Sequence, residues 1–327
     1  MPYKTGPLVT IAIPTYNRAG GYLKQAIASA VSQTYPHIEI IVSDNCSCDH
    51  TESVVKSFRN SRIRYFRQEK NIGANNNFNF CLEQANGEYF LLLQDDDLID
   101  ADLVGTCMKQ MNSNLETGII RTGTRVIDAQ GEVICESPNM VGGLSTEDFF
   151  LGWFTGKTAL YLCSTVFNTA RLREIGGFKS PKNLFQDDIA IARLAAQYGR
   201  LDIQAVKASF RRHDGEMTVS SKVSDWGDDS LTLLNLMCEL VSDKDRKRIY
   251  DEGMLFFSRV NYNRARNVKS PVMRFVAYWA VFKKFHYRHL PAIDHFSSPL
   301  YSVLQGTSIY YGLRFIKRKI KHMPAKG

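Results

Sequence analysis

The sequence lacks the long hydrophobic segments that direct a protein to or through a membrane. Residues 8–14 form an apolar stretch that is too short for a signal peptide, and no cleavage site follows it. The best candidate for a transmembrane helix, residues 271–282, contains Arg274 and falls well short of the roughly 20 residues that a span needs. We therefore expect a cytoplasmic protein.

Cysteine is sparse and irregularly spaced. The seven cysteines are an odd number, and only Cys46 and Cys48 lie close together. A C-x-C pair without a second pair is a poor zinc signal. Reduced thiols in a cytosolic protein are the better interpretation.

Positive charge is concentrated in the last third of the chain. Residues 226–327 carry 18 Lys and Arg against 8 Asp and Glu, whereas residues 1–225 carry 23 against 25. Basic segments of this kind seek phosphate, on a nucleic acid or on an anionic membrane. The basic character therefore belongs to the last third of the chain, whereas the first two thirds are nearly neutral.

Strands and helices alternate through the first hundred residues. We expect strands at 8–13, 38–42, 62–66 and 88–93, and helices at 23–31, 49–58 and 75–85, with Asp49 as a helix cap. This alternation predicts a parallel sheet covered by helices. Further on we expect an antiparallel pair at 119–127 and 132–135, a strand at 160–167, a helix at 187–198 and mostly helix beyond 225.

Polar residues follow three of these strands, where ligands of a parallel sheet bind. The segments are 14–18, 43–49 and 94–97. The last includes Asp95, Asp96 and Asp97, adjacent carboxylates that repel one another unless a counter-ion lies between them. A hard divalent cation, with substrate phosphate oxygens as its remaining ligands, would offset this repulsion. Alone, the same run could be a solvated loop.

Four motifs occur in order: IPTYNR at 13–18, VSDNCSCD at 42–49, NIG at 71–73, and ANGEY at 85–89 leading into 95–98. With them, residues 9–103 resemble the nucleotide-binding half of the family 2 glycosyltransferases, and the similarity continues more thinly to about residue 220. The resemblance implies an α/β fold of GT-A type, a Rossmann-like mixed sheet covered by helices, with a helical C-terminal extension.

The resemblance also implies a domain organisation and a reaction. We expect a GT-A domain at 1–224, with a nucleotide-binding half at about 8–103 and an acceptor half at about 118–220, and a basic helical region at 225–327. The reaction would be inverting transfer from a nucleoside-diphosphate sugar. The donor-binding residues it implies are Pro14, Thr15, Tyr16 (against the base), Arg18, Asp44 (accepting from base or ribose), Asn71, Gly73, Gln94, Asp95 and Arg211.

The implied metal site combines Asp96, Asp97 and His213, binding Mg²⁺ or Mn²⁺. His213 lies in a segment, 210–215, that resembles the part of the family in which a histidine after a strand completes the site. Gln94 is a departure, because the family usually has aspartate there, so the metal rests on the three aspartates that follow. A histidine in this position could also be structural.

The resemblance favours Asp187 as the general base, with Asp188 as a close second. In the family the base precedes a helix with an Arg-Leu pair about two turns later, as Arg193 and Leu194 are here. Both aspartates could instead be helix N-terminal acids favoured by the macrodipole. The aromatic segment 149–154 could form a platform for an acceptor sugar or pack in the core.

The spacing of apolar and basic residues at 309–320 predicts a basic amphipathic helix. Ile309, Leu313, Ile316 and Ile320 share one face, opposite basic residues, which suits the surface of an anionic bilayer. Packing on its own domain explains the pattern equally well. We expect a peripheral contact with the inner face of the cytoplasmic membrane and a carbohydrate or lipid-linked sugar acceptor, as in bacterial cell-surface polysaccharide or glycolipid synthesis.

Two other classes of protein are compatible with parts of the sequence. A metal-dependent nucleotidyltransferase also pairs aspartates with a nucleotide, but Gly20 and Gly21 are a poor phosphate-binding loop after the first strand. A non-catalytic protein that binds nucleic acid or membrane would explain the basic region. No nucleic-acid motif is found, so we expect no nucleic-acid partner.

Overall fold

The computed structural model describes residues 6–111, 117–213 and 221–286. The chain divides into two compact units, Met1–Ser221 with Asp228–Gly253, and Lys222–Gly227 with Met254–Gly327. Every strand below belongs to the first unit.

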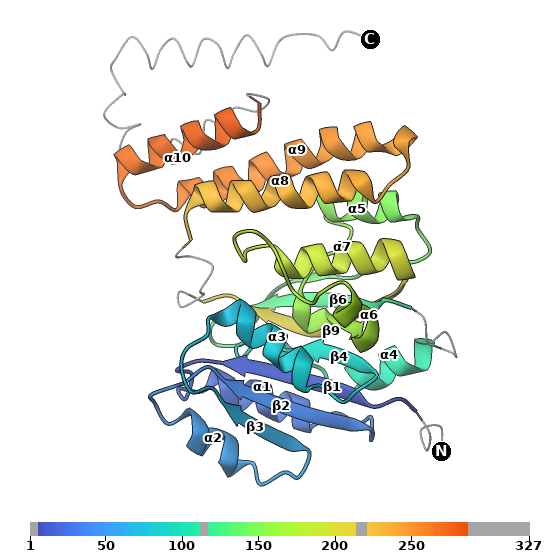
Figure 1. The fold of residues 1–327 in the computed structure, drawn as a ribbon, viewed down its shortest axis with the longest axis vertical. Coiled ribbons are helices and arrows are strands. Elements are labelled where there is room, and N and C mark those ends of the chain that lie inside the picture. The colour runs from blue at the N-terminus through green and yellow to red at the C-terminus, as the bar shows by residue number, and fades with distance from the viewer. Residues whose placement is uncertain (1–5, 112–116, 214–220, 287–327) are drawn as a thin grey trace. The chain divides into compact units, whose positions relative to one another are not determined.

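A nine-stranded mixed sheet forms the centre of the first unit (Figure 1). The strands are β1 (Val9–Thr15), β2 (Ile38–Asp44), β3 (Ile63–Arg67), β4 (Tyr89–Leu92), β5 (Leu98–Ile99), β6 (Ile119–Ile127), β7 (Val133–Ser137), β8 (Thr165–Asn168) and β9 (Arg200–Arg211). Their order is β3-β2-β1-β4-β8-β6-β9-β5, and β7 pairs with β6.

The first four strands run parallel, as the alternation of strands and helices predicts. β1 pairs with β2 and β4, and β2 pairs with β3, all in parallel. Every residue of β1 and β4 is buried. Strands covered on both faces need continuous apolar runs, which explains the near absence of polar residues in them.

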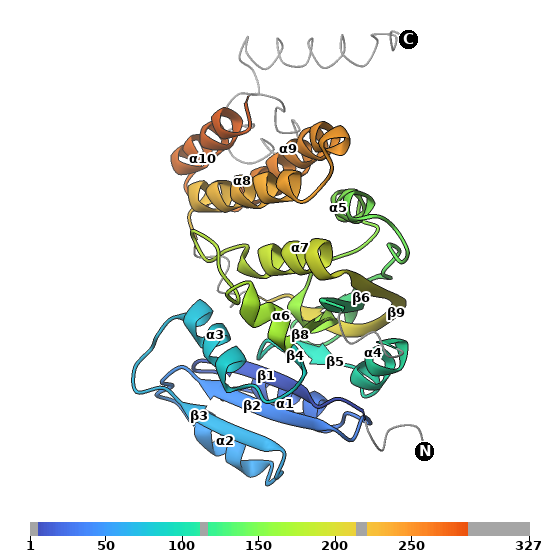
Figure 2. The ribbon, with the colours of Figure 1, turned by 45° about the vertical axis from the view of Figure 1, so that its right-hand side comes forward.

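Helices cover both faces of the sheet (Figure 2). The helices of the described residues are α1 (Tyr22–Val31), α2 (Thr51–Ser57), α3 (Ala74–Gln84), α4 (Leu103–Met111), α5 (Thr146–Phe154), α6 (Thr169–Glu174), α7 (Gln186–Tyr198), α8 (Val223–Glu239), α9 (Asp243–Arg266) and α10 (Pro271–Lys284). α1, α2 and α4 share one apolar core with one face of β1 and β2. α3 and α7 lie on the opposite face (Figure 2).

The second half of the sheet is mostly antiparallel. β6 and β7 form the predicted antiparallel pair. The predicted strand at 160–167 is wrong over most of its length, because Leu162–Ser164 form a 3₁₀ turn and the strand begins only at Thr165. The sequence patterns also gave no prediction for β5, which pairs antiparallel with β9, or for most of β9 itself.

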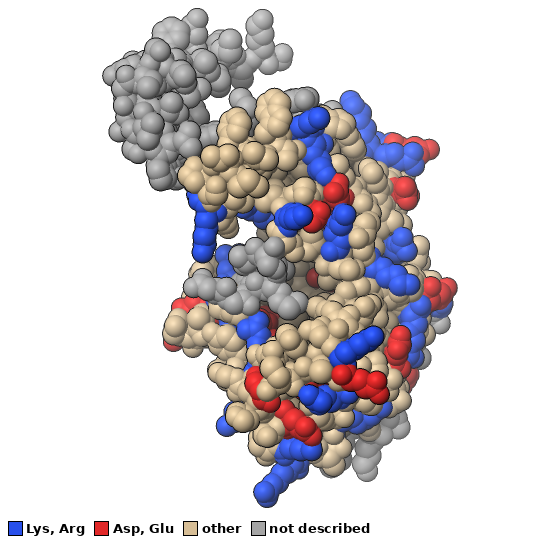
Figure 3. Space-filling view, turned by 60° about the vertical axis from the view of Figure 1, so that its left-hand side comes forward, with Lys and Arg blue, Asp and Glu red and all other residues tan. Residues whose placement is uncertain are grey.

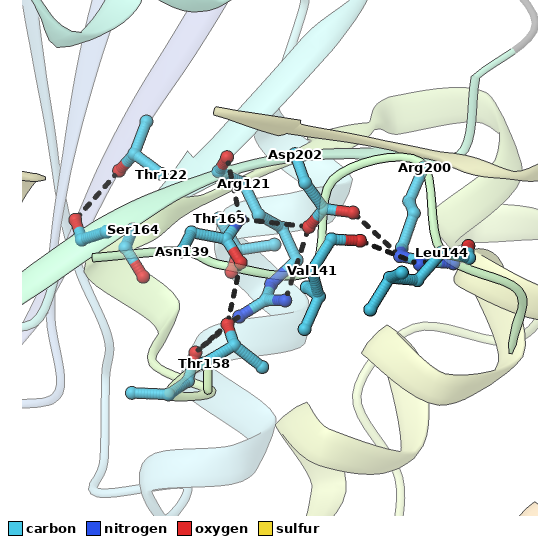
Figure 4. Close-up of polar contacts among 12 residues, drawn as sticks. Arg121, Thr122, Asn139, Val141, Leu144, Thr158, Ser164, Thr165, Arg200 and Asp202 are labelled. Carbon is cyan, nitrogen blue, oxygen red and sulfur yellow. Dashed lines mark hydrogen bonds and ion pairs between the residues drawn. The ribbon is translucent and has the colours of Figure 1, made fainter. Parts of the chain in front are cut away.

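A buried charge cluster joins β6 to β9 (Figure 4). The Asp202 carboxylate contacts Arg200 Nε at 2.7 Å and Arg121 Nη1 at 3.5 Å, and accepts a 2.9 Å hydrogen bond from Asn139 Nδ2. Both guanidinium groups also lie over the ring of Phe149. Phe149 and Phe150 are fully buried, so these two aromatics pack in the core rather than facing an acceptor.

Along the described helices, no segment is long and apolar enough to cross a bilayer. The basic amphipathic helix predicted at 309–320 falls outside the residues that the structure describes. Over the first unit, basic and acidic side chains are interspersed on the face seen in Figure 3.

Candidate active site

A cleft of about 650 Å³ opens where the strand ends of the first unit meet the start of α7. Eleven of the fifteen predicted site residues line it: Pro14, Thr15, Tyr16, Arg18, Asn71, Gly73, Gln94, Asp95, Asp96, Asp187 and Arg211. The four others, Asp44, Asp97, Asp188 and His213, contact or neighbour residues of this lining. The cleft therefore brings together segments that are far apart in sequence.

Short hydrogen bonds connect the ends of β1 and β2. Asn17, which adopts a φ of 53°, donates its N–H to Ser47 Oγ at 2.8 Å and accepts from Cys48 N at 2.9 Å. The Ala19 N–H donates to Asp49 Oδ2 at 2.9 Å. Asp49 also accepts from Thr51 N at the start of α2, but the N-cap residue of that helix is His50, so Asp49 lies one position before the cap rather than in it. These bonds fix the loop that carries Tyr16 and Arg18.

Asp44 is buried at the end of β2, and both of its carboxylate oxygens have protein donors. Oδ1 accepts from Ser47 N at 2.8 Å and Oδ2 from the Tyr65 hydroxyl at 2.6 Å. Arg67 Nε lies 4.0 Å from Oδ2. Burial, and then the hydrogen bond to Asp44, raise the pKa of Tyr65 well above its usual value. No sequence motif indicates Tyr65, because its position in β3 opposite β2 depends on strand pairing.

The loop of Asn71 and Gly73 is attached to the end of β2 by side-chain amides. Asn45 Nδ2 donates to Asn71 Oδ1 at 2.9 Å, and Asn45 Oδ1 accepts from Ile72 N at 2.8 Å. Asn71 Oδ1 also accepts from the Gly73 N–H at 2.8 Å. Gly73, with a φ of 83°, precedes α3, so the first turn of that helix borders the cleft.

Arg18 lies beside Asp95 and Asp96, the first two aspartates of the segment 94–97. Its guanidinium is 3.7 Å from Asp95 and 3.8 Å from Asp96. Burial, reinforced by the charge of Asp96, raises the pKa of Asp95 to about 7. Arg18 and the Thr15 hydroxyl oppose that shift. The repulsion expected between these carboxylates is therefore present, and a protein cation partly compensates it.

Asp97 is used for internal contacts. Its Oδ1 accepts from Arg211 N at 2.9 Å, and the Cys163 thiol also hydrogen-bonds the carboxylate. Burial first, and then the charge of Asp96, raise the pKa of Asp97 well above its ordinary value. Asp97 therefore connects the loop of residues 94–97 to the end of β9.

The end of β9 carries Arg211 and His213 to the same loop. Arg211 Nε donates to the Asp96 carbonyl at 2.8 Å and its Nη2 to Gln25 Oε1 at 2.8 Å. Two residues later, His213 Nε2 lies 2.9 Å from Asp96 Oδ2. The pairing of β5 with β9 makes this approach possible.

The described residues contain no group of three His, Cys, Asp or Glu side chains arranged to hold a metal. Asp96 and His213 nevertheless converge on one point at the edge of the cleft. Mg²⁺ and Mn²⁺ are commonly bound by one or two protein ligands and completed by substrate phosphate and water. The Asp96–His213 pair fits an ion of that kind.

Asp187 and Asp188 occupy the first turn of α7. Asp187 lines the cleft, and burial raises its pKa to about 6, against hydrogen bonds from the backbone at Asp187 and Asp188. Asp188 is buried, at 7% exposure, and its charge acts on Arg121 of the buried cluster. The two neighbours therefore differ: Asp187 faces the cleft, whereas Asp188 is turned into the protein.

Asp229 of α8 holds the loop that leads into α7, a contact the sequence did not suggest. Its carboxylate, fully buried, accepts from the Ser180 hydroxyl at 2.7 Å, Lys182 N at 2.9 Å and Leu184 N at 3.0 Å. All of these residues belong to the first unit. Because the loop runs directly into Asp187, Asp229 contributes to the position of the predicted base.

One wall of the cleft is rich in amide side chains that were not predicted as site residues. The residues are Asn45, Asn75, Asn76, Asn77, Asn183 and Gln186. The run of three asparagines at 75–77, which follows Gly73 and Ala74 at the start of a helix, was the available signal. Amides can donate and accept, which suits the hydroxyl groups of a sugar.

Residues 10–137 match the family model "Glycosyl transferase family 2". The chain belongs to the family 2 glycosyltransferases. It is 30% identical over 261 residues to an uncharacterised glycosyltransferase of Rickettsia felis, a match that covers 77% of this chain and 42% of the relative. It is 31% identical over 175 residues to the Campylobacter jejuni GalNAc(5)-diNAcBac-PP-undecaprenol beta-1,3-glucosyltransferase, covering 51% and 55%.

The fold of this family 2 glycosyltransferase also resembles a solved structure. The match is Staphylococcus aureus TarS 1–349 in complex with UDP-GlcNAc, with a TM-score of 0.63 at 18% identity, covering 85% of this chain and 81% of that one. The predicted GT-A fold is thus confirmed. The chain spans about half the length of the two curated relatives.

Proposed function

We propose that the chain transfers a sugar from a nucleoside-diphosphate sugar to an acceptor hydroxyl with inversion, in a single displacement. The observation that carries this proposal is the shared cleft. Asp187, an aspartate whose pKa is raised to about 6, lines the same 650 Å³ space as Asp95, Asp96 and the segment with Tyr16. The proposed proton acceptor and the proposed site for the nucleoside diphosphate therefore line the same cleft.

Asp187 is the proposed general base. A carboxylate with a pKa near 6 is ionised at neutral pH and more basic than an ordinary aspartate, so it can accept the proton of the attacking hydroxyl. The hydroxyl oxygen bonds to the anomeric carbon as the bond to the diphosphate oxygen breaks. One displacement without a covalent intermediate inverts the configuration. Asp229 holds the loop that leads into α7.

Asp96 and His213 are the proposed ligands of Mg²⁺ or Mn²⁺, with Asp97 as a predicted third ligand that also binds the Arg211 N–H. When bound, such an ion neutralises negative charge on the departing diphosphate. Arg18, beside Asp95 and Asp96, supplies a second positive charge at the same place. Asp44 and Tyr16 are proposed to bind the nucleoside.

The acceptor is proposed to be a carbohydrate or a lipid-linked sugar, in cell-surface polysaccharide or glycolipid synthesis at the inner face of the cytoplasmic membrane. Support comes from the Campylobacter jejuni relative, whose name specifies an undecaprenol-linked oligosaccharide. Asn183 and Gln186 of the amide-rich wall line the same cleft as Asp187, and amides of this kind suit the hydroxyl groups of a sugar. We propose that residues 1–224 carry the donor and acceptor sites.

Thermal unfolding with a panel of UDP-, GDP- and dTDP-sugars, each with Mn²⁺, tests the donor part. A ligand that binds only the folded protein raises the melting temperature in proportion to RT ln(1 + [L]/Kd). We expect one nucleotide class to raise it strongly in the wild type and only weakly in Asp44→Ala. No response to any nucleotide sugar, with a response to a nucleoside triphosphate, would favour the nucleotidyltransferase instead.

A further inference from the structure

Helix α10 of the second unit has apolar side chains on two opposite faces. Tyr278, Val281 and Phe285, just beyond its end, are buried and form the inner face. The outer face is exposed, with exposures of 51% to 72%. Its residues are Val272, Met273, Phe275, Val276 and Trp279, hereafter the outer apolar face.

The spacing of these residues makes them one continuous stripe. At 100° per residue, Val272, Phe275, Val276 and Trp279 lie within about 100° of one another around the helix axis. A surface helix of a globular protein normally turns charged and polar residues toward water. A contiguous exposed apolar patch therefore indicates that something else covers it in the working protein.

The charge of the surrounding chain indicates what covers it. From residue 254 to residue 286 the sequence contains seven Lys and Arg and no Asp or Glu. Lys269, just before the Ser270 cap, and Lys283, in the last turn, are exposed at the two ends of the stripe. Figure 3 shows an uncharged area on this side of the second unit, with basic side chains at its margin.

We propose that the outer apolar face of α10 docks on an anionic membrane surface, with the helix lying in the plane of the headgroups. Its 14 residues, about 21 Å of helix, are too short to span a bilayer. Apolar side chains and an indole bury at the acyl boundary, while Lys269 and Lys283 reach anionic headgroups. This surface lies in the described part of the second unit and does not depend on the chemistry proposed for the cleft.

Vesicle sedimentation with the full chain tests the docking surface. We expect binding to vesicles that contain phosphatidylglycerol, little binding to phosphatidylcholine alone, and a loss with rising salt. Phe275→Ser combined with Trp279→Ser should weaken binding by about tenfold or more. The matched control is Val133→Ser combined with Ile134→Ser, which removes an equally exposed apolar pair from β7 of the first unit and should leave vesicle binding unchanged.

Tryptophan fluorescence provides a second readout that does not require a polar substitution. Lipids brominated near the headgroup should quench the emission of the wild type on binding. Trp279→Phe keeps an aromatic ring on the stripe, so it should still bind vesicles while losing most of the quenching. Trp153 and Trp226, the remaining tryptophans, should contribute little to it.

Three results would overturn the proposal. One is unchanged vesicle binding by a double serine variant that keeps wild-type circular dichroism and donor hydrolysis. Another is equal binding to phosphatidylcholine and phosphatidylglycerol vesicles, or none to either. The third is a wild-type dimer in light scattering that the double variant loses, without vesicle binding, because the face would then be covered by a second copy of the chain.

Discussion

Asp96 and His213 are 117 residues apart in the sequence, and in the structure Asp96 Oδ2 lies 2.9 Å from His213 Nε2. A cation completed by substrate phosphates and water needs only one or two protein ligands, and a carboxylate oxygen beside an imidazole nitrogen at the edge of a cleft suits it. The proposed metal site depends on this pair.

His213→Ala should therefore weaken Mn²⁺ binding. Titration of Mn²⁺ in the presence of a nucleoside diphosphate, followed by calorimetry, should give an affinity at least about tenfold below that of the wild type. His50→Ala, outside the cleft, is the control and should bind as the wild type does. Equal affinities for His213→Ala and the wild type would remove His213 from the site.

Asp187→Asn should abolish transfer while leaving donor binding intact. Removing a general base costs about a hundredfold to ten-thousandfold in rate, and the amide keeps the shape of the side chain. Steady-state kinetics should therefore show a lower kcat with a similar KM for the donor. Asp188→Asn should have a smaller effect on kcat, because Asp188 is buried.

The pH dependence of the reaction should follow Asp187. A base must be ionised to accept a proton, so kcat/KM should fall as the pH drops through about 6, rather than near the ordinary aspartate value of 3.8. Burial stabilises the protonated form, which sets the direction of the shift. A profile that stays flat down to pH 5, with the protein still folded, would contradict this role for Asp187.

Asp229→Ala should lower kcat although Asp229 does not line the cleft. The substitution removes the acceptor for Ser180, Lys182 and Leu184, so the loop before Asp187 loses its support. Asp228→Ala, an exposed neighbour on α8, is the matched control. If Asp229 positions the loop, Asp229→Asn, which keeps one acceptor oxygen, should have a higher kcat than Asp229→Ala. If the effect were only a global loss of stability, the melting temperatures of Asp229→Ala and Asp229→Asn would fall in step with kcat.

Asp202→Asn should destabilise the first unit strongly. It leaves two buried guanidinium groups, those of Arg121 and Arg200, without their counter-charge, and breaking a buried pair costs about 3 to 5 kcal/mol. Urea denaturation measures the loss. Glu52→Gln, which breaks the exposed pair with Lys56, should change the free energy of unfolding little, because solvent screens that pair. Similar values for the two variants would contradict the account of the buried cluster.

Local sequence patterns were enough to predict the parallel half of the sheet. Buried strands such as β1 must be apolar throughout, and helices such as α1 must be amphipathic, so the pattern and the structure share one physical cause. The predictions failed where pairing is long-range. β5 has only two residues and is stabilised by β9, more than 100 positions later, so no local pattern could reveal it.

The residues of the candidate site also divide into those that local motifs predicted and those that depend on long-range packing. The motifs gave the residues that line the cleft, because strand ends of a parallel sheet meet at one edge. The motifs did not predict the roles of Tyr65 and Asp229 or the contact between Arg18 and the aspartates. These features depend on packing between segments that are distant in the sequence. The organisation into domains and the individual roles of the site residues stay predictions.

The most direct test of the central claim is product analysis after incubation with a matched nucleotide sugar and Mn²⁺. The account predicts release of nucleoside diphosphate that requires the metal, increases with an acceptor, and disappears in Asp187→Asn. Release of pyrophosphate, or release of nucleoside diphosphate that is equal in the wild type and Asp187→Asn, would contradict it.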